Sequence, residues 1–203
     1  MTITIVDYGI GNLGAIPNML RRAGVAAVVT SDPERIADAE RLILPGVGAY
    51  DAGVRQLRAA GLEAVLTRKI VHEGVPVLGL CLGMELLSDS SEEGNMPGLG
   101  WIPGRVVRFR LPEESGLRVP HMGWNTVEPV RHDAIEPVLD GARFYFAHSY
   151  HFEPADLSHV VARTTYGYPF ASVVRRDNVL GVQFHPEKSH RFGLALLAWF
   201  AGG

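Results

Sequence analysis

An uninterrupted apolar run, VPVLGL at residues 75–80, ends directly at Cys81 and constrains the fold of this chain more than any other stretch. A run without polar alternation is typical of a strand that is buried on both faces. Strand-like segments also occur at residues 2–8, 26–31 and 41–50, and segments with helical spacing separate them. This β–α repetition predicts a parallel sheet with helices on both faces and ligands beyond the carboxyl ends of the strands.

The second half has a different character, because residues 98–168 are rich in proline and glycine. We expect short strands at residues 105–109, 143–150, 170–176 and 179–184, followed by a final helix at residues 190–201. The sequence therefore predicts an α/β fold: a mostly parallel central sheet flanked by helices, with antiparallel additions in the second half. No linker or repeat divides the chain, and we expect residues 1–203 to form one domain.

Composition excludes several classes of protein. The net charge of −3 gives no basic footprint for nucleic acid, and a single cysteine cannot form an internal disulfide. The start of the chain has no secretory pattern, and no apolar run reaches the roughly 18 residues that span a bilayer. We expect a cytoplasmic protein.

Cys81 lies where the buried strand ends at Leu80 and a helix is expected to begin near Leu82. Its neighbours Gly79 and Gly83 leave room for a strained corner, as in the serine elbow of α/β hydrolases. The helix amino terminus would stabilise a thiolate, and the Leu82 N–H could bind an oxyanion. The alternative is a cysteine that only packs in the core. Two glycines favour the nucleophile, because a core strand gains nothing from them.

The stretch GVQFHPEKS, residues 181–189, provides a base for such a nucleophile. His185 follows an apolar strand, so it is expected at the same rim of the sheet as Cys81. Pro186 fixes the turn, and Glu187 can accept a hydrogen bond from the imidazole and orient it.

Together, GLCLGMELL and GVQFHPEKS resemble the nucleophile elbow and the H-P-E motif of class I, triad-type glutamine amidotransferases. The resemblance implies that Cys81 is the nucleophile, His185 the base and Glu187 its orienting partner. It also implies that the reaction needs no metal and no organic cofactor.

Four further segments are similar to the glutaminase subunits of imidazole glycerol phosphate synthases. They are VDYGIGNLGAI (6–16), LILPGVGAY (42–50), PHMGWN (120–125) and YFAHSY (145–150). This resemblance implies hydrolysis of L-glutamine to glutamate and ammonia, and transfer of the ammonia to a (β/α)₈-barrel cyclase subunit in L-histidine biosynthesis. Two alternatives stay open: a glutaminase that serves another acceptor synthase, and a non-catalytic scaffold subunit, against which the intact Cys81, His185 and Glu187 argue.

In these relatives the amide of the residue corresponding to Val47 completes the oxyanion hole with that of Leu82, and the loop flips to present it. Gly46 and Gly48 would permit such a flip at low cost. An ordinary glycine turn is the alternative explanation of PGVG.

The resemblance also implies a set of substrate-binding residues: Gly48, Glu85, His148, Ser149 and Tyr150. Glu85 lies one helical turn after Cys81, where a carboxylate could pair with the α-ammonium of glutamine. The family commonly has glutamine at this position, and a glutamate that stabilises the helix dipole is the alternative.

Three residues are expected at the partner interface: Asn12, Trp124 and Lys188. Taken alone, Trp124 would more often be a core residue. Gly9, Gly11 and Gly14 fit G-x-G-x-x-G literally, but no convincing acidic residue for a ribose follows them, since Asp32 precedes a proline.

Overall fold

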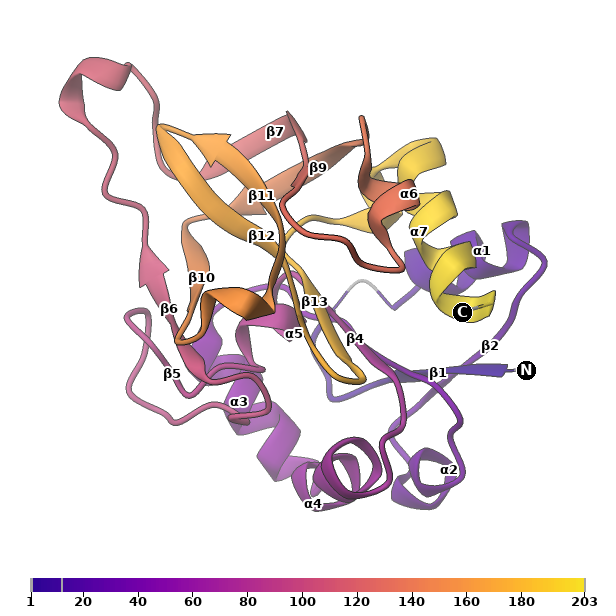
Figure 1. Ribbon diagram of the computed structural model, residues 1–203. Helices are drawn as coiled ribbons and strands as arrows, with labels where there is room; N and C mark the ends of the chain where they lie inside the picture. The colour runs from indigo at the N-terminus through magenta and orange to yellow at the C-terminus, as the bar shows by residue number, and fades with distance from the viewer. Residues whose placement is uncertain (1, 12, 203) are drawn as a thin grey trace.

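The structure is a computed structural model and describes residues 2–11 and 13–202. Within these residues, eleven strands form the main sheet (Figure 1). In spatial order, its central path is β2 (Ala26–Thr30), β1 (Thr2–Val6), β3 (Leu42–Leu44), β4 (Val77–Leu80), β13 (Val179–Val182), β12 (Tyr168–Arg176), β10 (Tyr150–Pro154), β6 (Gly104–Arg108) and β5 (Ser90–Ser91). β11 (Val160–Tyr166) pairs with β12 and with β8 (Glu128–Pro129), and a separate ribbon joins β7 (His121–Thr126) to β9 (Arg143–His148).

The direction of the strands changes at β13. From β2 to β13 every neighbouring pair is parallel, whereas β13–β12, β12–β10 and β10–β6 are antiparallel. The predicted mostly parallel sheet with antiparallel additions is therefore confirmed. All four residues of β4 are buried, as the apolar run predicted.

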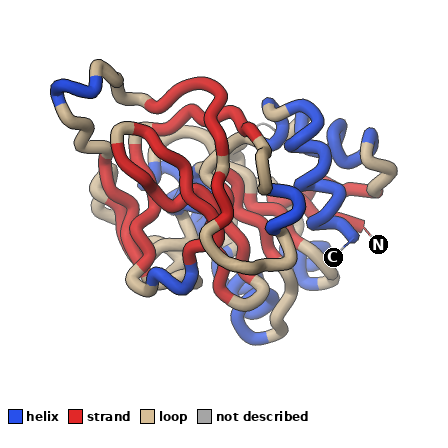
Figure 2. Tube along the Cα trace, turned by 45° about the horizontal axis from the view of Figure 1, so that its top comes forward, coloured by secondary structure: helices blue, strands red, loops and turns tan. Residues whose placement is uncertain are grey.

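Helices cover both faces of the sheet (Figure 2). Side chains alternate along each strand, so that Ile43 packs in one core cluster and its neighbours Leu42 and Leu44 in the other. The first cluster receives α1 (Ala15–Arg22), α6 (Glu136–Leu139) and α7 (His190–Gly202). The second receives α2 (Pro33–Ala37), α3 (Tyr50–Ala59), α4 (Glu63–Thr67), the π-helical turn η1 (Arg68–His72) and α5 (Leu82–Glu85). Gly61, with φ +69°, lies between α3 and α4.

Three details differ from the sequence-based expectation. Strands β5, β7, β8, β10 and β11 were not predicted, because they are short or carry polar and glycine residues. The helix after Cys81 is a single turn, so the dipole available to a thiolate is small. Trp124 lies on β7 with 38% of its surface exposed, so the alternative of a core residue is wrong, and its place at the partner interface stays a prediction.

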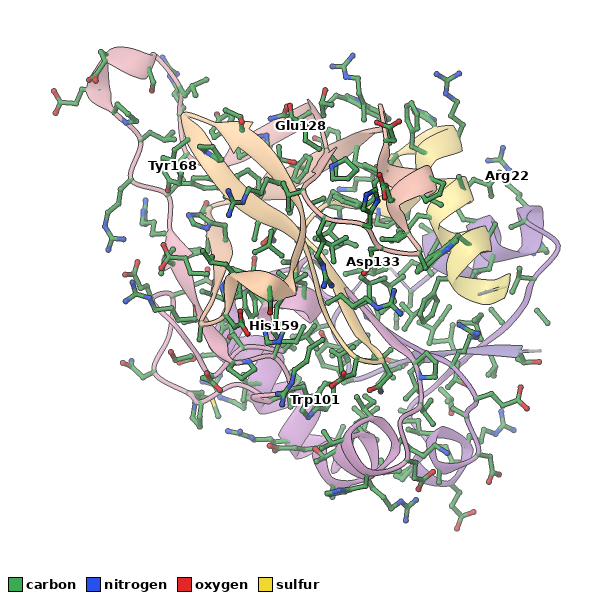
Figure 3. All side chains as sticks on the ribbon, in the orientation of Figure 1. Arg22, Trp101, Glu128, Asp133, His159 and Tyr168 are labelled. Carbon is green, nitrogen blue, oxygen red and sulfur yellow. The ribbon has the colours of Figure 1, made fainter. Side chains whose placement is uncertain are left out.

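Charged side chains lie around the outside of the molecule, with nitrogen and oxygen tips interspersed, as for Arg22 at the end of α1 (Figure 3). In the part of the chain that the structure describes, no helix has the length and apolarity needed to cross a membrane.

The glycines beside Cys81 allow α5 to fold back tightly onto the sheet. A Cβ on Gly79 would lie 2.7 Å from the carbonyl oxygen of Gly83. A Cβ on Gly83 would overlap the carbonyl oxygen of Leu44 in β3. The two glycines are thus required by backbone packing, which explains their presence in an otherwise apolar run.

We predict that Gly83→Ala lowers the free energy of unfolding by about 1–3 kcal/mol or more, because the backbone of β3 must move to admit the methyl group. Denaturant unfolding measures this. Gly14→Ala is the matched control: Gly14 has φ −85°, and a Cβ added there would have no neighbouring atom within 4 Å, so this change should be neutral or slightly stabilising. Equal effects of the two changes would contradict the packing argument.

Candidate active site

The corner at Cys81 is strained and held from both sides. Cys81 has φ 51° and ψ −111°, a backbone conformation that non-glycine residues rarely adopt. Its N–H donates to the carbonyl of Val182 (2.9 Å), and its own carbonyl accepts from the amides of Met84 (2.9 Å) and Glu85 (3.1 Å). Strain that the surrounding structure enforces in this way is concentrated at functional sites in proteins.

His185 lies three residues beyond the end of β13 and is fixed through its backbone and its ring. Its N–H donates to the carbonyl of Tyr145 in β9 (2.8 Å), and its carbonyl accepts from the Ser189 hydroxyl (2.6 Å). Its ring Nδ1 lies 2.9 Å from Oε1 of Glu187, and both side chains are only 5% exposed. A carboxylate accepts, so Nδ1 carries the proton and Nε2 is free to accept one.

Cys81 and His185 line the same cavity, which has a volume of 340 Å³. Other predicted residues share it: Val47, Gly48, Leu82, Glu85, His148, Ser149, Tyr150 and Lys188. Glu187 lies behind His185, and Trp124 stacks on His190 (5.4 Å between ring centroids) rather than lining the cavity. Asn12 lies outside the described residues.

The helix turn stabilises a thiolate in the expected direction, but burial outweighs this effect. Burial raises the pKa of the Cys81 thiol, and the carboxyl of Glu85 raises it further. The Leu82 N–H acts in the opposite direction, but a single turn does not offset desolvation. The thiol is therefore neutral at rest, and a base must remove its proton.

Glu85 is buried against a residue that the sequence analysis did not single out. Its Oε1 accepts a hydrogen bond from Nε2 of Gln183 (2.8 Å), and Gln183 is fully buried. Burial raises the pKa of Glu85 to about 8. Gln183 precedes His185 by two residues in an extended segment. Residues two apart in such a segment lie on the same face, so this spacing was a usable signal that Gln183 lies on the side of the catalytic histidine.

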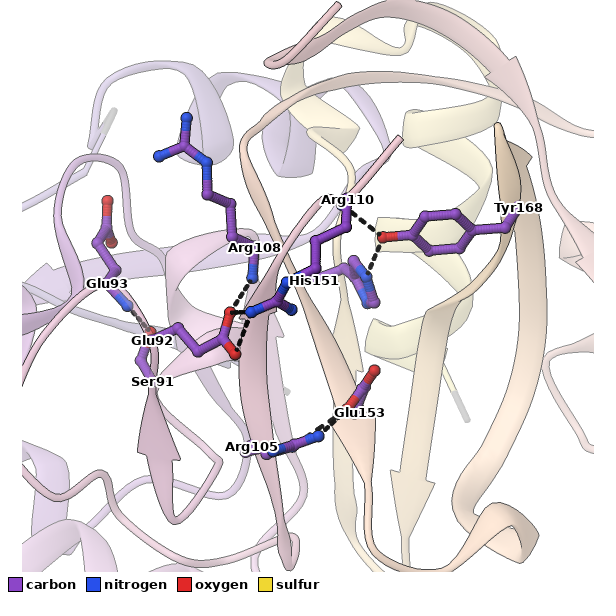
Figure 4. A network of polar contacts seen from close by, with 9 residues as sticks. All are labelled: Ser91, Glu92, Glu93, Arg105, Arg108, Arg110, His151, Glu153 and Tyr168. Carbon is purple, nitrogen blue, oxygen red and sulfur yellow. Dashed lines mark hydrogen bonds and ion pairs between the residues drawn. The ribbon is translucent and has the colours of Figure 1, made fainter. Parts of the chain in front are cut away.

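A second carboxylate, Glu93, lines the cavity and was also missed. Its Oε2 accepts from the backbone N–H of Tyr50 (2.8 Å), and its own N–H donates to the Ser91 hydroxyl (3.1 Å), as Figure 4 shows in part. Its charge contributes to the raised pKa of Glu85. Two carboxyl groups near each other in one cavity favour a cationic ligand group.

The glycine loop Pro45–Gly48 is tied to the amino-terminal strand. The hydroxyl of Tyr8, just after β1, donates to the carbonyl of Pro45 (2.6 Å). A Cβ on Gly46 would meet the Tyr8 hydroxyl and the Gly83 amide at 2.8 Å, and Gly48 has φ +105°. The loop therefore depends on glycine at both positions. Tyr8 gives the DYGIGN stretch a role in packing against this loop.

Comparisons with known proteins agree with this geometry. The family described as "Glutamine amidotransferase class-I" matches residues 4–201. The imidazole glycerol phosphate synthase subunit HisH 2 of Methanococcus maripaludis is 46% identical over 199 residues, or 98% of each chain. HisH 2 of Pseudomonas aeruginosa is 47% identical over 199 residues, again 98% of each chain. A crystal structure of a glutamine amidotransferase matches with a TM-score of 0.76 at 24% identity, covering 98% of this chain and 99% of that chain, which shows the fold.

We predict that Glu85→Gln stabilises the protein increasingly as the pH rises. The unfolded chain loses the Glu85 proton near pH 4.5, whereas the folded chain keeps it to about pH 8, so the wild type loses stability across this interval. Denaturant unfolding at pH 5 and pH 8.5 should show a relative gain for Glu85→Gln of more than about 1 kcal/mol.

Glu73→Gln is the control for that experiment. The ion pair with Lys69 lowers the pKa of Glu73, which is ionised throughout this range, so its effect should not change between the two pH values. A flat difference for Glu85→Gln as well would show that the buried carboxyl is not protonated.

Proposed function

The chain belongs to the class-I glutamine amidotransferase family, and we propose that it is the glutaminase subunit of an imidazole glycerol phosphate synthase. The HisH relatives carry this proposal, because the identity of 46% and 47% extends over nearly the whole chain. The family match over residues 4–201 supports one amidotransferase domain for residues 1–203. We also propose a cytoplasmic location, since the free thiol of Cys81 must stay reduced.

In the proposed reaction, His185 removes the Cys81 proton through Nε2 as the sulfur attacks the side-chain amide carbon of L-glutamine. The raised pKa of the thiol supports this coupled transfer, since a free thiolate is disfavoured before substrate binds. Glu187 holds the proton of Nδ1 and stabilises the imidazolium that forms.

The tetrahedral intermediate then places negative charge on the former carbonyl oxygen. We assign the N–H of Leu82 and, after reorientation of the glycine loop, that of Val47 to this oxyanion. Collapse breaks the carbon–nitrogen bond, and the proton on His185 leaves with ammonia. A γ-glutamyl thioester remains on Cys81.

Hydrolysis of the thioester repeats the same steps with water. His185 accepts a proton from water, hydroxide attacks the thioester, and the carbon–sulfur bond breaks as the proton returns to the sulfur. The products are glutamate and the regenerated thiol. No net proton is left on the protein.

The α-ammonium of glutamine is proposed to bind against Glu85 and Glu93. Burial is the main cause of the raised pKa of Glu85, and the charge of Glu93 adds to it, so a cation beside the two carboxyls would favour the ionised form of Glu85. The wall at residues 147–150 lines the other side of the cavity, and its segment His148–Tyr150 is proposed to bind the substrate's α-amino and carboxylate groups.

We propose that the partner is a cyclase subunit that receives the ammonia. Met122 and Lys188 line the cavity and are exposed, and Trp124 lies two residues from Met122 on β7. Met122 and Trp124 are 64% and 38% exposed, which supports a docking face there. Asn12 remains a predicted interface residue. The acceptor product would be imidazole glycerol phosphate, released with aminoimidazole carboxamide ribonucleotide in L-histidine biosynthesis.

We predict that Cys81→Ala reduces glutaminase turnover by at least about 10³-fold and Glu187→Gln by at least about 10²-fold. Both are assayed in the complex with the cyclase and its ligand. A glutamine-like alkylating agent should label the wild type at Cys81. Near-native turnover of Cys81→Ala would contradict the covalent mechanism. An unlabelled wild type would indicate a scaffold subunit. A pull-down of the native partner that captures a different synthase would identify another acceptor.

We predict that Glu93→Gln raises the KM for glutamine by about 10-fold or more with a smaller effect on kcat, because a charged hydrogen-bond partner of the substrate is lost. Glu92→Gln is the matched neighbour, since Glu92 turns away toward Arg108 and Arg110 (Figure 4). Its exposed ion pair contributes little, and KM should change by less than about twofold. Equal KM values for Glu93→Gln and the wild type would remove Glu93 from the binding site.

A further inference from the structure

Two buried histidines that take no part in the proposed proton transfers face each other, and one of them, His148, lines the active-site cavity. Nδ1 of His121 in β7 lies 2.9 Å from Nε2 of His148 at the end of β9. The residues are 3% and 6% exposed. They are directly opposite each other in the β7–β9 register.

Chemistry fixes which nitrogen of each ring carries the proton. The Tyr150 carbonyl, 2.6 Å from Nδ1 of His148, can only accept, so that Nδ1 is protonated. Burial lowers the pKa of His148 well below its usual value, so the ring is neutral and its Nε2 is an acceptor. His121 must then donate from Nδ1.

Asn125 completes the chain on the other side of His121. Burial lowers the pKa of His121 to about 4, so its Nε2 also accepts, in this case from Nδ2 of Asn125 (3.2 Å). The amide of Asn125 cannot be reversed, because its Oδ1 accepts from the Thr126 N–H (2.8 Å) and its Nδ2 also donates to the carbonyl of Thr165 (3.0 Å). The donor and the acceptor of each hydrogen bond in this series are therefore fixed.

Aromatic rings restrict the histidines further. His121 stacks between Phe146 and Tyr166, with centroid distances of 4.7 and 4.1 Å and interplanar angles of 26° and 27°. The edge of His148 meets Phe109 at 5.2 Å. Rotation of the His121 ring out of this stack would lose both contacts and both hydrogen bonds.

We propose that His121 and Asn125 are positioning residues that hold the substrate-binding wall in place through His148. The directed chain runs from Asn125 through His121 and His148 to the carbonyl of Tyr150, and we call it the histidine chain. Its last bond closes the turn between β9 and β10, and that turn lines the cavity. The proposal rests on the proposed function only in that its effect on activity is measured with glutamine.

Two variants of His121 separate hydrogen bonding from packing. His121→Phe keeps the stacked ring but has no donor, whereas His121→Asn loses the ring but places Nδ2 near the position of the imidazole Nδ1. In the complex with the cyclase, we expect His121→Phe to raise the KM for glutamine about tenfold with kcat changed by less than about twofold. We expect His121→Asn to lower thermal stability more than His121→Phe does, yet to keep KM within about twofold of the wild type.

Thr126→Ala is the matched control on the same strand. Its side chain is exposed and lies on the opposite face of β7 from His121 and Asn125, so KM and kcat should stay at wild-type values. A KM that is unchanged in His121→Phe, or raised equally in His121→Asn, would overturn the proposal.

A spectroscopic arm is independent of catalysis. In the full chain labelled with ¹⁵N-histidine, His148 should be neutral with its proton on Nδ1 at pH 7, because the Tyr150 carbonyl accepts there. The resonance of its Nε2 should shift in His121→Phe, which removes the hydrogen-bond donor to that nitrogen, and should stay near the wild-type position in His121→Asn. A proton on Nε2 of His148 would overturn the histidine chain even in an active enzyme. If the protein lacked glutaminase activity, the proposed function would fail, whereas the protonation states of the two histidines would still test the histidine chain.

Discussion

The parallel pairing of β4 with β13 is the constraint on which the rest of the structure depends. It sets Leu80 opposite Val182, and the next amide along β4, that of Cys81, continues the ladder to Val182. Two segments about a hundred residues apart in the chain therefore end at the same edge of the sheet. The sulfur and the imidazole of His185 then reach one cavity without any long loop to carry them.

A low resting charge is the second general property of this site. Burial shifts the thiol of Cys81, the carboxyl of Glu85 and the ring of His148 toward their neutral forms. A zwitterionic ligand would bring its own charges into a poorly solvated space, where each interaction with a fixed dipole is stronger than in water. The site is thus arranged to respond to the arrival of a ligand rather than to hold ionised groups in advance.

The sequence was sufficient for the parallel half of the sheet and for antiparallel additions in the second half, because apolar runs carry that information locally. Most residues that line the cavity followed from short motifs and the family resemblance that these motifs indicate. The sequence was insufficient for Glu93, since nothing in SEEG distinguishes the glutamate that faces the cavity from the one beside it. The pairing of His121 with His148 depends on the register of a ribbon whose two strands are separated in the chain by β8 and α6. The protonation state of Cys81 depends on how deeply the corner is covered, which composition does not report.

The β7–β9 ribbon stands outside the main sheet, yet the carbonyl of Tyr145 in it holds the backbone of His185. Its outward side chains include Met122 and Trp124. A partner bound to that outer surface would therefore contact the same ribbon that holds the backbone of His185 through a hydrogen bond. The ribbon thus joins the exposed side chains of Met122 and Trp124 to the backbone of the residue that carries the proton.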